Sequence, residues 1–161
     1  MDVGKVHLGL ALVAMASGAV VLLRPKGGRS HRRGGWIFVG SMVGMNVTAL
    51  FIYDLTGSPG PFHVLAVFSL VGVVFGATHA RCRKPAVAWR PLHAYWMAWS
   101  YVGLLAAAAS EVTTRVPEAS FWWMVVGSSG AVILAGALVI RARMPRSLGF
   151  EKTRSPSPGP R

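Results

Sequence analysis

Five histidines and one cysteine are the side chains of this sequence best suited to hold a metal ion or a haem. Imidazole and thiolate both ligate zinc and copper, and histidines on different helices can hold a haem iron between them. What they bind depends on which of them the folded chain brings together, and therefore on the elements that carry them. The six residues are His7, His31, His63, His79, His93 and Cys82.

Long uncharged stretches predict that membrane-spanning helices carry these residues. The chain is 53% hydrophobic and 14% charged, whereas a soluble domain has about a quarter of its residues charged. A helix needs ~20 mostly apolar residues to cross a bilayer. The sequence predicts an all-α integral membrane bundle over residues 1–143. Its five transmembrane helices are expected at about 5–23, 35–53, 62–80, 93–111 and 120–140.

The basic residues lie almost entirely on one side of these predicted spans. Fifteen of the seventeen Lys and Arg residues fall in the first and third connections and in the tail, and only Lys5 and Arg115 fall opposite. An excess of Lys and Arg marks the cytoplasmic side. The chain is therefore predicted to be N-outside and C-inside.

Residues 144–161 are rich in proline, serine and arginine, which predicts a disordered basic cytoplasmic tail. Basic residues near a membrane surface are attracted to anionic lipid headgroups by ~1 kcal/mol each. The net charge of +12 therefore needs no nucleic acid as a partner. Ala14-Met15-Ala16 has the pattern of a signal-peptidase site, but the apolar run continues to Leu23, which favours an uncleaved first span.

This topology sorts the histidines to two membrane faces. His7 and His63 start spans near the outer face, whereas His31, His79, His93 and Cys82 lie near the inner face. His63 and His79 are sixteen residues apart, about 24 Å along a helix, so they cannot share one metal. His31 is expected to precede its helix. His93 is the strongest candidate ligand, and Met97, one turn along, offers a softer one.

Three interpretations of the histidines remain open. His31, His93, His63 and His7 could hold haem b for electron transfer across the membrane. Alternatively, His31, His79, His93 and Cys82 could form a zinc or copper cluster at the inner face. The third interpretation is that they are interfacial residues in a structural or accessory membrane protein without a cofactor. No Walker loop, HExxH or GxSxG motif indicates an enzyme.

Other residues inside the spans are candidates for helix packing or for a pocket. Small residues four apart let helices approach closely, within one bundle or in a homodimer; here they are Gly40 with Gly44, and Gly72 with Gly76. Asn46 and Tyr53 lie on one helical stripe, so they either line an outward pocket or, for Asn46, bond a neighbouring helix. Glu111 is predicted to pair with Arg115, with a proton relay as the alternative.

Four stretches carry a family resemblance. They are His31-Arg32-Arg33-Gly34-Gly35-Trp36, Met45 to Tyr53, Gly60-Pro61-Phe62-His63, and His93 with Trp99 to Leu104. The chain resembles a family of small bacterial multi-spanning membrane proteins classed as a domain of unknown function. This resemblance implies a location in the bacterial plasma (inner) membrane. Its small, histidine-bearing bundle is similar in outline to the cytochrome b561 group, which implies a multi-spanning helical fold and haem b as a cofactor.

Overall fold

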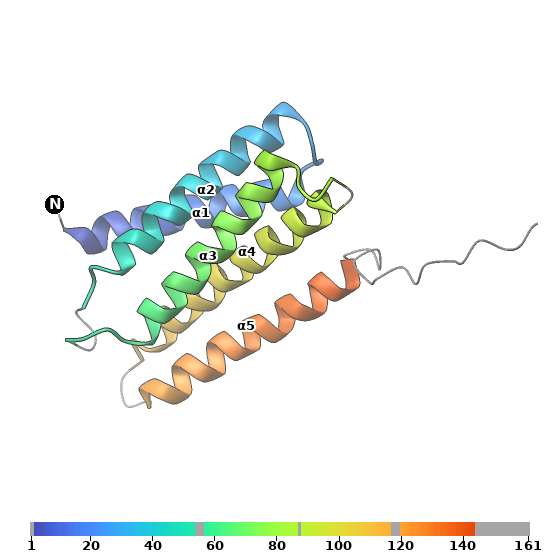
Figure 1. Cartoon of the computed structure of the whole chain (residues 1–161). Coiled ribbons are helices and arrows are strands. Elements are labelled where there is room, and N and C mark those ends of the chain that lie inside the picture. Colours follow the sequence, from blue (N-terminus) through green and yellow to red (C-terminus); the bar gives the residue numbers. More distant parts are fainter. Residues whose placement is uncertain (1, 54–56, 87, 117–119, 144–161) are drawn as a thin grey trace, which may run out of the picture.

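The chain folds into five long helices, as seen in a computed structural model that describes residues 2–53, 57–86, 88–116 and 120–143 (Figure 1). No strand occurs in these ranges, so the predicted all-helical class is confirmed. The predicted tail at 144–161 lies outside the described residues. The helices are α1 (Val3–Leu23), α2 (Arg29–Ala49), α3 (Pro61–Cys82), α4 (Trp89–Thr113) and α5 (Phe121–Arg143).

Local sequence explains where several helices begin and end. The side chain of Asp2 caps α1 by accepting a hydrogen bond of 3.0 Å from the backbone N–H of Gly4. Helix α3 starts at Pro61, one residue before the predicted span. Proline suits the first position of a helix, because the backbone N–H that it lacks would have no helical acceptor there. The helix ends at Cys82, and the next residue, Arg83, takes the left-handed conformation (φ 52°) that closes many helices.

Helix α2 differs from the predicted span at both ends. It begins at Arg29, inside the basic connection, and ends at Ala49 rather than at Tyr53. His31 therefore lies in the first turn of a helix, and the expectation that it precedes the helix was wrong. The physical reason is that a long apolar run marks the part of a helix that suits lipid. Backbone hydrogen bonds such as Arg32 N to Gly28 O (3.1 Å) extend the helix into polar sequence.

Consecutive helices run antiparallel and form two hairpins with a fifth helix alongside. Helix α1 packs on α2, and α3 packs on α4. The hairpins meet where α2 contacts α3 and α1 contacts α4, while α5 lies along α4 (Figure 1). As a result, the connections α1–α2 and α3–α4 and the last turn of α5 lie at one end of the bundle. We call it the basic end because it contains Arg24, Lys26, Arg29, Arg32, Arg33, Arg81, Arg83, Lys84, Arg90, Arg141 and Arg143.

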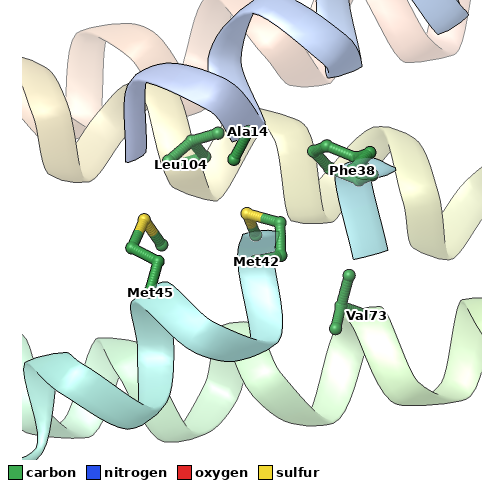
Figure 2. Packing of buried hydrophobic residues seen from close by; sticks show 6 residues of the cluster. All are labelled: Ala14, Phe38, Met42, Met45, Val73 and Leu104. Carbon is green, nitrogen blue, oxygen red and sulfur yellow. The ribbon is translucent and has the colours of Figure 1, made fainter. Parts of the chain in front are cut away.

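The core lies between the two hairpins. Ala14 of α1, Met42 of α2, Val73 of α3 and Leu104 of α4 are almost completely buried there, together with Phe38 and Met45 (Figure 2). Many large apolar side chains instead face outward, such as Phe68 and Trp123, which are 71% and 76% exposed. Three helices are long and apolar enough to cross a membrane: Val3–Leu23, Phe62–Cys82 and Phe121–Arg143. An apolar outer surface of this extent is suited to lipid and not to water.

Replacing Gly18 should test the packing between the hairpins. A Cβ atom at Gly18 would lie 2.5 Å from a ring carbon of Tyr101 and 3.0 Å from one of Phe38. Gly18→Leu should therefore lower the free energy of unfolding in detergent by about 1–3 kcal/mol through overpacking. Gly9→Leu is the matched control, because the same helix offers open space at Gly9. Equal melting temperatures for the two variants would contradict this packing.

Candidate functional site

Two histidine rings meet at the basic end of the bundle. His31 lies in the first turn of α2 and His93 in the first turns of α4, and their ring centres are 6.5 Å apart with an angle of 89° between the ring planes. His93 donates a hydrogen bond of 2.8 Å from Nδ1 to the carbonyl oxygen of Gly76 on α3. Because a carbonyl only accepts, this bond places the proton on Nδ1 and leaves Nε2 with its lone pair.

His31 has a ring nitrogen that lacks a partner. Its Nδ1 atom is buried and makes no hydrogen bond to any described residue, which is costly because burial removes the water that would otherwise solvate it. His31 precedes the apolar part of α2. Burial lowers its pKa, and the positive charges of Lys26 and of a protonated His93 lower it further. The neutral imidazole is therefore the favoured form.

Gly76 allows α4 to approach α3 closely at this site. A Cβ atom at Gly76 would lie 2.5 Å from Cε of Met97 and 3.2 Å from Cβ of Trp96. The side chains of Met97 and of His93, one turn apart on α4, therefore both contact α3 at Gly76. Met97 therefore lies one turn from His93, on the side of α4 that contacts α3.

The other predicted inner ligands do not join this pair. Nδ1 of His79 bonds the carbonyl of Phe75 in its own helix (2.7 Å), and Cys82 is exposed. No group of three or more His, Cys, Asp or Glu residues could hold a metal ion in the part of the chain that the structure describes. The structure thus does not assemble the four-residue cluster of His31, His79, His93 and Cys82, because the backbone bond of His79 orients its ring.

At the opposite end, the two predicted haem ligands contact different partners. Nδ1 of His7 lies 3.1 Å from both the carbonyl of Met45 and the hydroxyl of Thr48, which ties α1 to α2. His63 accepts a hydrogen bond from the backbone N–H of Gly60 (3.1 Å) and stacks on Tyr53, with ring centres 4.8 Å apart. Among the described residues, ring contacts join His63 to Tyr53 and not to His7.

Polar residues inside the helices mostly bond the backbone or an adjacent helix. Asn46 is 2% exposed and donates to the carbonyl of Met42 (2.8 Å) and to the hydroxyl of Ser69 on α3 (3.2 Å). Asn46 therefore bonds a neighbouring helix, which is one of the two roles predicted for it. The predicted ion pair of Glu111 with Arg115 is present, at 2.8 Å on the surface.

The predicted packing glycines divide into two groups. A Cβ atom at Gly44 would lie 3.1 Å from a methyl carbon of Leu10 on α1, and one at Gly72 would lie 3.1 Å from the hydroxyl of Ser100 on α4. Together with Gly76, these residues face neighbouring helices of the same chain. Gly40 is exposed, and a Cβ atom added there would meet no atom of another described element within 4 Å.

Sequence reasoning missed the part played by Lys26. Its ammonium group donates hydrogen bonds to the carbonyls of Val21, Leu22 and Arg24, at 2.8, 2.6 and 3.0 Å. These bonds satisfy carbonyls that the end of α1 leaves without helical partners. A lysine just beyond a helix C-terminus is a recognisable signal for such capping. Lys26 thereby closes α1 beside the histidine pair.

A double-mutant cycle should measure the hydrogen bond between Asn46 and Ser69. Asn46→Ala and Ser69→Ala should show a coupling of about 0.6 kcal/mol in the free energy of unfolding, as is usual for such bonds between membrane helices. Thermal or denaturant unfolding in detergent provides the measurement. Asn46→Ala with Thr78→Ala is the control pair, because Thr78 bonds its own helix. Additive effects for Asn46 and Ser69 would contradict the bond.

Comparison with known proteins agrees with this architecture. No curated protein and no solved structure matches the chain. The sequence profile of one family, described as "Predicted membrane protein (DUF2306)", matches residues 4–146, which cover the five helices except for Val3. The chain is thus a membrane protein that belongs to this family of predicted membrane proteins of unknown function.

Proposed function

We propose that the chain is a five-span integral protein of the bacterial plasma membrane, with its N-terminus outside and its C-terminus in the cytoplasm. The observation that carries the proposal is the common direction of the three most apolar helices. Helices α1, α3 and α5 all run toward the basic end (Figure 1). If each of them crosses the bilayer, the chain must return across it twice, and α2 and α4 are the segments available for the return.

The lengths of α2 and α4 support these return passes. They contain 21 and 25 residues, or roughly 31 and 37 Å of helix, against a hydrocarbon core of ~30 Å. Between Arg90 and Glu111, helix α4 has no Asp, Glu, Lys or Arg. The arginines of α2 are all in its first turns, where long basic side chains can reach the headgroup region.

The orientation rests on charge. Of the described basic residues, only Lys5 and Arg115 are remote from the basic end, and basic connections remain in the cytoplasm. Two arginines of this end, Arg83 and Arg90, lie 5.9 and 5.3 Å from the ring of Trp89. Tryptophan beside arginine is typical of the membrane interface. We propose that the basic end, continued by a basic tail at 144–161, contacts anionic lipid headgroups.

A structural or accessory role without haem is the function that the histidine contacts support best. Two haem groups would need His7, His31, His63 and His93 as two facing pairs. His7 instead bonds α2, and His63 caps α3 and stacks on Tyr53. These contacts are what interfacial histidines make when they join helices. Association with a second copy or with another membrane protein suits such a role, and the exposed Gly40 offers a close approach for it.

Thiol labelling tests the orientation. Cys82 is exposed and adjoins the basic connection α3–α4, so a membrane-impermeant maleimide should leave it unlabelled in intact cells and label it after permeabilisation. The matched control is Val116→Cys in a Cys82→Ser background, since Val116 is 54% exposed at the opposite end. This variant should be labelled in intact cells. The reverse pattern would overturn the orientation.

An absorption spectrum tests the absence of haem. Protein purified from a haem-producing bacterial host should show no Soret band and no α-band on reduction with dithionite, because neither outer histidine is positioned to face a second one. A haem content near one per chain, lost in His93→Ala and His31→Ala, would instead establish the electron-transfer alternative.

A further inference from the structure

We propose that His31 and His93 bind a single Cu(I) ion at the basic end of the bundle, with the thioether of Met97 as a third ligand. The proposal goes beyond a structural role and does not depend on the membrane orientation. It starts from the contact of the two rings, which come from α2 and α4 and stand 6.5 Å apart at their centres.

The spacing of the rings matches a metal bridge. An ion bound about 2.0–2.1 Å from one nitrogen of each imidazole holds the two ring centres roughly 6 Å apart. The observed separation of the ring centres, 6.5 Å, is close to this value. The perpendicular ring planes are compatible with such a bridge, since each imidazole donates its lone pair within its own plane.

The hydrogen bonds around the pair are those that a metal site requires. A ligating histidine usually donates its second ring N–H to a carbonyl or carboxylate, which fixes the tautomer and orients the ring. His93 makes this bond to Gly76, at 2.8 Å. His31 has the complementary property, a buried Nδ1 that no described residue satisfies. A bound ion would satisfy one imidazole and would leave the hydrogen bond of the other intact.

The surroundings favour a soft, singly charged ion. Eleven Lys and Arg residues gather at the basic end, in the connections α1–α2 and α3–α4 and in the adjoining turns of the helices. These charges repel a divalent cation more strongly than a monovalent one. Neutral imidazoles and a thioether are ligands that suit Cu(I). Met97 contacts α3 at Gly76, the residue whose carbonyl accepts the hydrogen bond of His93.

Harder ions lack their usual ligands here. Zinc prefers four ligands from Cys, His and carboxylates, and the described chain assembles no group of three or more such residues. His79 bonds its own helix instead of joining the pair. A site of two imidazoles and one thioether therefore favours Cu(I) over Zn(II), because Cu(I) is stable with two or three ligands.

A competition titration with Cu(I) alone tests the site. The full chain, purified in detergent with a histidine-free affinity tag, is titrated anaerobically against a Cu(I)-selective chromophoric chelator. Wild type should withdraw one equivalent of Cu(I) per chain. Uptake of none, or an equal affinity for Zn(II) measured with a zinc-selective chelator, would overturn the proposal.

Variants assign the ligands. His31→Ala and His93→Ala should each weaken Cu(I) binding by at least about tenfold. Met97→Leu should weaken it less, because leucine keeps the packing volume against Gly76.

His79→Ala and His7→Ala are the matched controls and should bind as wild type does. His31→Gln and His93→Gln provide polar replacements if the alanine variants lose their helix content by circular dichroism. Unchanged affinity in both the His31 and His93 variants would overturn the site. The maleimide labelling of Cys82 tests only the proposed membrane orientation, so its failure would not affect the Cu(I) site.

Discussion

The contact between Tyr101 and Gly18 is the interaction on which the rest of the bundle depends. It joins α4 to α1 and thereby holds the two helical hairpins around one core. The ring of Tyr101 occupies the space that a side chain at position 18 would need, and its hydroxyl donates to the carbonyl of Met15 at 3.2 Å. Phe38 packs on the same ring, with centres 6.1 Å apart. In lipid, where apolar side chains gain little by leaving their solvent, such close packing and hydrogen bonding supply the association energy.

The same requirement explains the polar side chains within the helices. Ser110 on α4 bonds the hydroxyl of Ser128 on α5 at 3.2 Å, and Thr113 donates to that hydroxyl at 3.1 Å. These bonds connect α5, which otherwise lies at the edge of the bundle (Figure 1). Transferring a hydroxyl group into hydrocarbon costs less free energy when the group is hydrogen-bonded to a partner. These polar residues thus stabilise the contact between α4 and α5.

Against this background, an unsatisfied nitrogen is informative. Three buried side-chain atoms in the described chain lack a hydrogen-bond partner, namely His31 Nδ1, His63 Nε2 and Trp99 Nε1. Of the three, only His31 also faces the ring of a second histidine. The ring of His63 is covered by Tyr53 instead. The two ends of the bundle therefore differ chemically: one uses histidine to join helices, and the other brings two imidazoles together.

The sequence by itself determined the helical class, the approximate helix positions and the gathering of charge, because these follow from local composition and from backbone hydrogen bonding within each segment. It also predicted the pair of Glu111 with Arg115, which is set by helical spacing alone. Only the tertiary structure decided that His93 meets His31 rather than His79 and Cys82, and that Gly44 contacts α1 while Gly40 faces outward. Residues four apart differ in direction by about 40° around a helix. The rotation of each helix against its neighbours, which hydropathy does not encode, therefore decides which side chains meet.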